Sequence, residues 1–128
     1  HELRINITID IPGKVESFLI DTVDLARILG IFLDNAIEAT LETEQPQIGL
    51  NIIQNKTGVS IIISNRFLDN GVMLHKLKQK DFSTKIGHQG IGLWNAQKII
   101  SSYDNVLLET TMKCDYFTQH IELTDRKE

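Results

Sequence analysis

Two small polar residues, Asp34 and Asn35, interrupt the most apolar stretch of this sequence, which runs from Asp24 to Ala39. Both are poor helix formers, although the stretch around them has the three- and four-residue spacing of a buried helical face. A buried asparagine needs hydrogen-bond partners, because leaving its amide unpaired costs roughly 1–3 kcal/mol. Asn35 therefore either bonds to a neighbouring strand or offers its amide oxygen to a metal ion, since hard cations such as Mg²⁺ prefer oxygen ligands.

A second polar stretch combines residue types that suit phosphate. Hydroxyl groups and an ammonium group come first, and three glycines follow at the start of a helix predicted over 89–101. These residues are Ser83, Thr84, Lys85, Gly87, Gly90 and Gly92. Glycines let a ligand approach the backbone closely, and the free N–H groups of a helix start attract anions. A flexible helix start that binds nothing is the alternative, and the clustering of these residue types makes it the weaker one.

Neither of the two common nucleotide-binding motifs is present. The glycine spacing of a Walker loop, with its following Lys and Ser or Thr, is absent. A Rossmann fingerprint needs a strand directly before its first glycine, and the segment 76–85 is too polar to form one. A phosphate site here must belong to another fold.

The elements that would position these residues follow from periodicity. The Asn35 helix, capped by Asp21 or Thr22, is predicted from about 24 to 39 and fades near Thr43. Alternating apolar residues predict a half-buried first strand over 3–11 and two hairpins, 48–52 with 59–63 and 106–112 with 117–123. A short extended piece is expected over 18–20. Residues 65–87 lack a clean pattern, and such long segments are often functional. This order predicts an α/β two-layer sandwich, a mixed and mostly antiparallel sheet with helices covering one face.

Composition narrows the class of protein. The 128 residues suit one domain, 1–128, and a net charge of −4 argues against a nucleic-acid partner. One cysteine, Cys114, excludes an internal disulfide and is compatible with a reducing compartment. No apolar run of these residues reaches the length of a membrane span, and we expect no signal peptide within them. Since the chain begins with His1 and enters a strand almost at once, we expect a domain excised from a longer protein.

The two polar stretches together resemble the motifs of a known superfamily. Leu-Asp-Asn-Ala-Ile-Glu-Ala at 33–39 is similar to the N box of the GHKL superfamily, which includes gyrase, Hsp90, MutL and the histidine kinases. Phe-Ser-Thr-Lys at 82–85 and Gly-His-Gln-Gly-Ile-Gly-Leu at 87–93 are similar to its F box and G2 box. The resemblance covers Ile5 to Leu123. It implies the GHKL, or Bergerat, ATP-binding fold, with ATP and Mg²⁺ as cofactors and a lid at about 65–87.

The resemblance also assigns roles to residues of this chain. Asn35 matches the asparagine that holds Mg²⁺, and Asn65 takes the place of the aspartate that reads adenine, with Asp69 as a more distant rival. The matches to phosphate contacts are Ser83, Thr84, Lys85, Gly90 and Gly92, and Gly87 and Leu93 of the same motif are further expected nucleotide-binding residues. The glycines that follow the adenine aspartate in the family are missing here. Because an amide oxygen is a weaker acceptor than a carboxylate, we expect a modest nucleotide affinity.

The residue at position 31 narrows the kind of ATP-dependent reaction that the chain could carry out. Gyrase-type and MutL-type ATPases carry a glutamate there as the base for water, and many histidine kinases carry an asparagine, whereas this chain has Ile31. An apolar side chain cannot polarise water, so a hydrolase, a topoisomerase or an anti-sigma serine kinase is disfavoured. No residue of this chain is assigned with certainty as catalytic.

The lead-in Ile-Asp-x-x-Asp-Leu at 20–25 and the N box are similar to the quorum-sensing peptide receptor kinases of the AgrC type. That resemblance implies a catalytic and ATP-binding domain that delivers the γ-phosphate to a histidine on a separate dimerisation domain, with an AgrA-like response regulator downstream. It also implies the cytoplasmic part of a membrane-anchored bacterial receptor, itself without direct membrane contact. The alternative is a degenerate nucleotide-binding or protein-interaction module, docking a partner through Leu74, Leu77 and Phe82.

Overall fold

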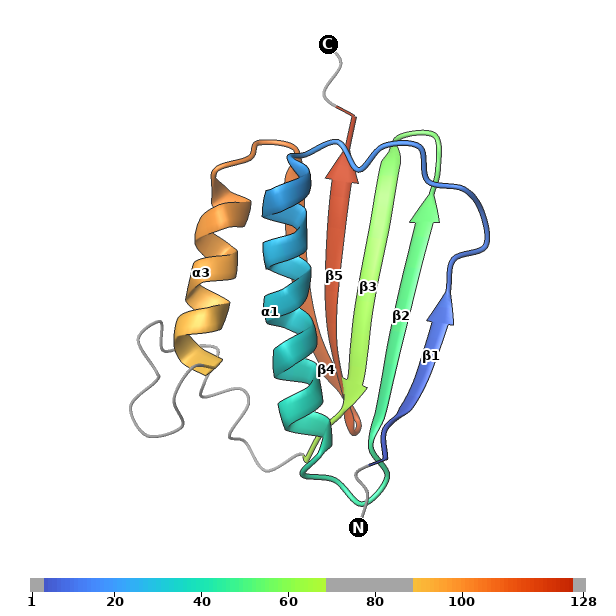
Figure 1. The fold of residues 1–128 in the computed structure, drawn as a ribbon, viewed down its shortest axis with the longest axis vertical. Coiled ribbons are helices and arrows are strands. Elements are labelled where there is room, and N and C mark those ends of the chain that lie inside the picture. Colours follow the sequence, from blue (N-terminus) through green and yellow to red (C-terminus); the bar gives the residue numbers. More distant parts are fainter. Residues whose placement is uncertain (1–3, 69–88, 126–128) are drawn as a thin grey trace.

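The computed structural model describes residues 4–68 and 89–125 and forms one sheet with two helices on one of its faces (Figure 1). In chain order the elements are β1 (Asn6–Asp10), α1 (Thr22–Thr40), β2 (Gln47–Gln54), β3 (Gly58–Arg66), α3 (Gln89–Ser101), β4 (Val106–Lys113) and β5 (Tyr116–Thr124). The strand order is β1-β2-β3-β5-β4, in which β1 and β2 are parallel and all other neighbours antiparallel. The predicted sandwich and its mixed, mostly antiparallel sheet are confirmed. Neither helix of the described part is long and apolar enough to cross a membrane.

Helix α1 begins where its sequence provides a cap. The carboxylate of Asp21 accepts hydrogen bonds from the backbone N–H groups of Val23 and Asp24 at 2.8 and 3.3 Å, so Asp21 and not Thr22 is the N-cap. At the other end, the hydroxyl of Thr40 accepts from the N–H of Gln47 at 2.9 Å and donates to its carbonyl at 3.2 Å. This exchange fixes the end of α1 to the start of β2.

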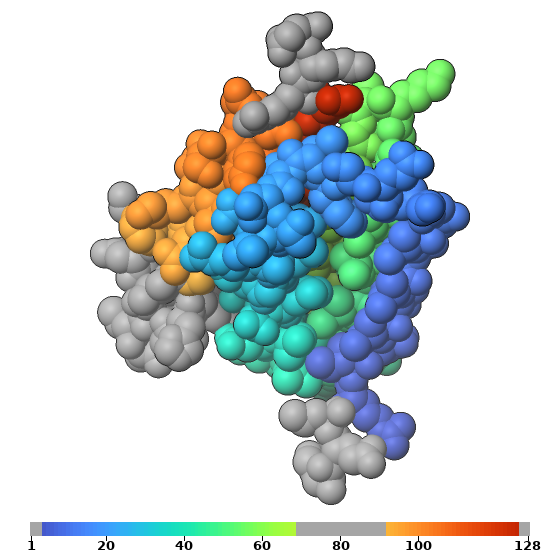
Figure 2. All heavy atoms as spheres, turned by 45° about the horizontal axis from the view of Figure 1, so that its top comes forward, coloured from blue at the N-terminus to red at the C-terminus, as the bar shows by residue number. Residues whose placement is uncertain are grey.

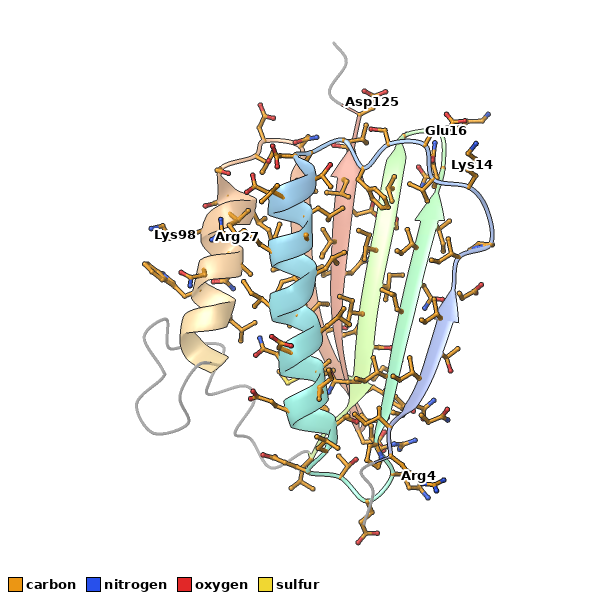
Figure 3. The ribbon with its side chains drawn as sticks, in the orientation of Figure 1. Arg4, Lys14, Glu16, Arg27, Lys98 and Asp125 are labelled. Carbon is orange, nitrogen blue, oxygen red and sulfur yellow. The ribbon has the colours of Figure 1, made fainter. Side chains whose placement is uncertain are left out.

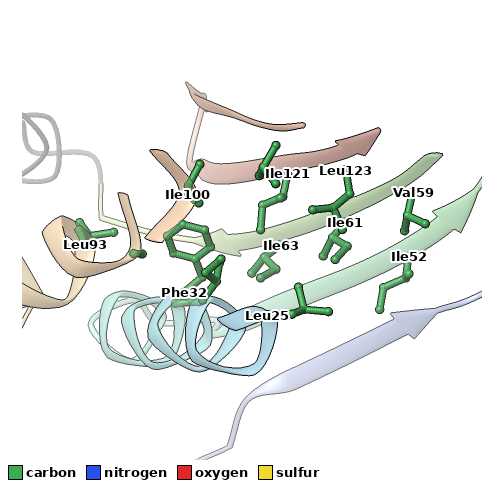
Figure 4. Close-up of a cluster of buried hydrophobic side chains, with 14 of the residues drawn as sticks. Leu25, Phe32, Ile52, Val59, Ile61, Ile63, Leu93, Ile100, Ile121 and Leu123 are labelled. Carbon is green, nitrogen blue, oxygen red and sulfur yellow. The ribbon is translucent and has the colours of Figure 1, made fainter. Parts of the chain in front are cut away.

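The main core lies between the helices and the sheet (Figure 4). Its most deeply buried members include Ile28 of α1, Ile61 of β3 and Ile121 of β5, each with no exposed surface. Alternate residues of the strands point into this layer, as the sequence pattern predicts. The full set of buried members is Leu25, Ile28, Phe32, Ala36, Ile48, Ile52, Val59, Ile61, Ile63, Leu93, Ala96, Ile100, Val106, Ile121 and Leu123.

The expectation for the first strand is wrong in two respects. Only 6–10 forms β1, and every residue of it is exposed, with Ile7 and Ile9 at 57% and 61%. Register places these two side chains beside Ile48 and Leu50, on the face that the helices cover. However, α1 packs over β2 and β3, so β1 lies beyond it at the edge of the molecule (Figure 2). Alternation identified the strand, but it could not show that no helix reaches that edge.

The extended piece expected at 18–20 is also absent. These residues form a bend in which Leu19 has a φ of 69°, while their side chains pack against the main core. The predicted turns are confirmed: the Asn55 side chain accepts hydrogen bonds from the N–H groups of Thr57 and Gly58, both at 2.9 Å. A Cβ on Gly58 would stand 1.9 Å from the carbonyl oxygen of Leu123, so only glycine fits that turn.

Candidate functional site

Four polar side chains, each from a different element, lie toward the same end of the sandwich. They are Asn35 of α1, Asn65 of β3, Thr110 of β4 and Gln119 of β5, and we call them the polar band. On the sheet, Thr110 is opposite Gln119, and Asn65 lies one inward pair further along, opposite Phe117. Asn65 and Gln119 are only 2% and 4% exposed. By alternation along their strands, the three sheet residues share the inward face with the main core.

On each of the three strands, the polar-band residue lies between a residue of or against the main core and a residue of or against a second apolar cluster. This end cluster consists of Ala39, Phe67 and Phe117, with Met112 packed against it. Along β5 the inward residues run from Ile121 through Gln119 to Phe117, and β3 and β4 show the same change. A polar layer inside an apolar interior is costly unless its groups find partners, so such layers are often functional.

Three members of the band have partners in the protein. The Thr110 hydroxyl donates to Oε1 of Gln119 at 2.5 Å, and Nδ2 of Asn65 donates to the backbone carbonyl of Arg66 at 3.1 Å. Nδ2 of Asn35 differs, because it is buried and has no hydrogen-bond partner in the described structure. A buried amide nitrogen without a partner fits a site where a bound ligand supplies oxygen atoms that accept its hydrogen bonds.

The start of α3 lies at the same end of the molecule as the polar band. Figure 1 shows the end of β3, the C-terminal half of α1 and the start of α3 together at one end. Gly90 and Gly92 lie in the first turn of α3, where backbone N–H groups lack acceptors within the helix. A Cβ on Gly92 would stand 3.4 Å from Cγ2 of Ile31, one turn before Asn35 on α1. Gly92 therefore packs against α1 one helical turn before Asn35.

The end of β3 is held from the other face of the sheet. Arg66 bonds Asp115 at 2.5 Å through Nη1, and its Nη2 donates to the Tyr116 hydroxyl at 3.0 Å and to Oε1 of Gln47 at 3.2 Å. Its guanidinium also lies 5.0 Å from the centre of the Tyr116 ring. These contacts connect three strands and hold the backbone next to Asn65 in place.

The opposite end of the helix pair is closed by hydrogen bonds within the protein. The hydroxyl of Tyr103 donates to Asp24 at 2.5 Å and accepts from the N–H of Asp21 at 3.2 Å. The hydrogen bond to Asp24 raises the pKa of the Tyr103 phenol above its usual value. Beside it, Nδ2 of buried Asn105 donates to the carbonyls of Leu19 and Thr124 at 3.2 and 3.0 Å.

The described structure contains part of the predicted site. Asn35, Asn65, Gly90 and Gly92 lie at the same end of the sandwich, and the Leu93 side chain is buried in the main core, so that only its backbone can face a ligand. The predicted phosphate and adenine residues Asp69, Ser83, Thr84, Lys85 and Gly87 lie outside the described residues. So do the expected lid beyond Leu68 and the docking residues Leu74, Leu77 and Phe82. Among the described residues, no group of three or more His, Cys, Asp or Glu side chains could hold a metal ion.

Thr110 and Gln119 were not identified from the sequence. The signal was present, because both occupy inward positions of alternating strands, between Leu108 and Met112 and between Phe117 and Ile121. Polar residues at such positions are either partnered structural groups or site residues. The pairing of β4 with β5, which sets Thr110 opposite Gln119, brings the two together.

Comparison with known proteins shows which family this chain matches and which solved structures share its fold. A family model described as a GHKL domain matches residues 20–124. The nucleotide-free catalytic domain of the histidine kinase ThkA superposes with a TM-score of 0.74 at 24% identity, covering 94% of this chain and 80% of that one. The histidine kinase AdeS of Acinetobacter baumannii superposes with a TM-score of 0.67 at 12% identity, covering 98% of this chain and 56% of that one. A histidine kinase of Burkholderia phymatum superposes with a TM-score of 0.63 at 14% identity, covering 94% of this chain and 58% of that one. The chain thus spans little more than half of the last two structures, and a comparison with curated proteins finds no match.

Proposed function

The chain belongs to the GHKL domain family, and we propose that it is the Mg-ATP-binding catalytic domain of a sensor histidine kinase. The observation that carries the proposal is the buried Nδ2 of Asn35, which lacks a partner in the described structure and lies one turn from the contact with the glycine-containing start of α3. The likeness to histidine kinase catalytic domains supports the same fold for this chain.

In this proposal Asn35 interacts with the phosphates and their metal ion. Its amide oxygen is a suitable ligand for Mg²⁺, which usually takes few protein ligands and completes its shell with water and phosphate oxygens. Its Nδ2 can then donate to a phosphate oxygen, which removes the cost of leaving that group unpaired. Mg²⁺, when bound, neutralises negative charge on the transferred phosphate.

The remaining residues hold and orient the nucleotide. The N–H groups of the first turn of α3, at Gly90 and Gly92, can donate to phosphate oxygens with the support of the helix dipole. Asn65 directs its amide nitrogen to the backbone carbonyl of Arg66, and its oxygen can accept from the adenine amino group. The five predicted contacts outside the described residues, from Asp69 to Gly87, belong to the same proposal.

The chain is proposed to transfer phosphate and not to hydrolyse ATP. Ile31 packs against Gly92 and the main core, and an apolar side chain there cannot take a proton from water. The acceptor in this proposal is a histidine on a separate dimerisation domain, which supplies its own proton acceptor. By its sequence resemblance we place the parent among membrane-anchored quorum-sensing receptor kinases of the AgrC type, with an AgrA-like response regulator downstream.

Nucleotide titration tests the proposal. Trp94 of α3 is a built-in reporter, partly buried with Nζ of Lys98 4.9 Å from the centre of its ring, and Figure 3 shows Lys98 directed away from the sheet. We expect saturable, Mg-dependent ATP binding by the chain and by the control Asp34→Ala, whose side chain is exposed. Asn35→Ala should lose that binding. Absence of ATP binding by the unmodified chain, verified by calorimetry, would indicate the degenerate interaction module instead.

A further inference from the structure

Gln119 is a buried amide that the phosphate and metal roles do not use. It lies on β5 between two inward apolar residues, Phe117 and Ile121, and is only 4% exposed. The sheet could have continued its apolar face at this position. An amide retained there needs a specific partner, and Thr110 supplies part of it.

Thr110 determines how Gln119 is presented. Because the Thr110 hydroxyl donates to Oε1 of Gln119, the amide oxygen is engaged and the two N–H groups of Nε2 are left to donate elsewhere. Asn65 has the reverse arrangement, since its Nδ2 donates to the carbonyl of Arg66 and its oxygen can accept. The two amides therefore offer one donor and one acceptor.

Strand register places this donor and acceptor on neighbouring strands. Asn65 of β3 is opposite Phe117 of β5, so Gln119 is its diagonal neighbour on the same inward face. Such diagonal neighbours lie about 7–8 Å apart, within reach of long side chains. A flat heterocycle lying against this face can contact both amides.

We propose that Gln119, positioned by Thr110, acts with Asn65 to select adenine over guanine. Adenine presents its N6 amino donor beside ring-nitrogen acceptors, whereas guanine presents the acceptor O6 where adenine has its amino group. The acceptor of Asn65 matches the adenine amino group and opposes O6 of guanine. The donor of Gln119 matches a ring acceptor of adenine, N1 or N7, and opposes guanine where the contact is to N1, because guanine carries a hydrogen there but keeps the acceptor N7. The second amide also compensates for the uncharged acceptor at position 65. This inference rests on the proposed nucleotide-binding function.

A panel of nucleotides tests it by calorimetry. The unmodified chain should bind Mg-ATP at least tenfold more tightly than Mg-GTP. Either 1-deaza-ATP or 7-deaza-ATP, each lacking one ring acceptor, should bind about tenfold more weakly than ATP, and the affected analogue identifies the atom that Gln119 contacts. Gln119→Leu should bind ATP about tenfold more weakly and should no longer distinguish ATP from that analogue.

The controls separate this role from a structural one. Thr110→Val keeps the glutamine but removes the hydroxyl that orients it. This variant should reduce the ratio of ATP affinity to GTP affinity, and it should lose less ATP affinity than Gln119→Leu. Equal losses for ATP and both deaza analogues in Gln119→Leu would overturn the inference, because they would indicate a general distortion. An unmodified chain that accepts GTP as well as ATP would overturn it even if Gln119→Leu fails to fold. If the unmodified chain binds no nucleotide, both the proposed function and this inference are overturned. If ATP binding depends on Asn35 but not on Gln119, only the inference is overturned.

Discussion

Two asparagines at opposite ends of the sandwich, the buried Asn105 and the half-buried Asn35, use their amides differently. Nδ2 of Asn105 donates to two backbone carbonyls from distant segments, and the backbone carbonyl of Asn105 accepts from the N–H of Thr124 at 2.9 Å, while its buried Oδ1 has no partner in the described structure. Asn35 is in the middle of a helix, and its buried Nδ2 bonds to nothing in the described structure. At one end, polar groups connect segments of the chain. At the other, they are held in place by neighbours and remain available for a ligand.

The same difference extends to the surroundings of each asparagine. Around Asn105, the cap residue Asp21, Asp24 and Tyr103 bond to one another and close the top of the helix pair. The C-terminal half of α1, which carries Asn35, lies toward the same end of the molecule as the start of α3 and the end of β3 (Figure 1). The energetic consequences of removing each asparagine should therefore be opposite, and the following predictions test that contrast.

The largest effect is expected from Asn35→Ala. Mg-ATP affinity should fall at least about 100-fold, or about 2.8 kcal/mol, because the metal ligand is removed. The free energy of unfolding should stay the same or rise by about 0.5 kcal/mol, since alanine is the better helix former and no protein hydrogen bond of Nδ2 is lost. Urea denaturation measures the stability, and calorimetry measures the affinity. A clear loss of stability would mean that Asn35 is a structural residue after all.

Asn105→Ala should lower the stability of the fold and leave the Mg-ATP affinity unchanged. Two hydrogen bonds from a residue that is 5% exposed are lost, and two backbone carbonyls lose a donor, so unfolding should become easier by about 2 kcal/mol. Mg-ATP affinity, measured below the unfolding transition, should be unchanged. A parallel loss of affinity would contradict the separation of the two ends.

Gly92→Ala should affect binding without affecting packing. A Cβ there would make only ordinary contact with Ile31, and alanine favours the helix, so stability should not fall. If phosphate approaches the backbone of this turn closely, the added methyl group should weaken ATP binding about tenfold, or about 1.4 kcal/mol. An affinity equal to that of the unmodified chain would place the phosphates elsewhere.

Tyr103 should give the smallest effect, and only at high pH. Its pKa is raised because Asp24 accepts its proton and repels the phenolate, so the folded state retains that proton to higher pH than the unfolded state does. The stabilisation is complete below about pH 10, the pKa of an unfolded tyrosine, and is lost as the pH rises through the raised pKa of the folded state. Tyr103→Phe should remove this component from the pH dependence of the unfolding free energy. If both proteins show the same dependence above pH 10, the Asp24 contact does not stabilise the fold.

Much of the fold could be predicted from the sequence because its signals are local. The cap at Asp21, the apolar face of α1 and the turn at Asn55 each depend on residues close together in the chain. The expectation for β1 was wrong because alternation reports the two faces of a strand but not whether a helix covers them. Asn35 was identified because an asparagine in an apolar helix is unusual, whereas Gln119 was missed because one polar residue on a short strand is common.

The sequence by itself determined the elements, the asparagine within α1 and the glycines at the start of α3, since helix and strand periodicity act over a few residues. Only the tertiary structure decided that the polar residues of α1, β3, β4 and β5 gather toward one end of the sandwich, where Gln119 is opposite Thr110 and diagonal to Asn65. That arrangement depends on a strand order in which β5 lies between β3 and β4, with Thr110 opposite Gln119 and Asn65 opposite Phe117. Such pairings join residues far apart in the chain and are set by the packing of the whole sheet beneath its helices, which no local pattern encodes.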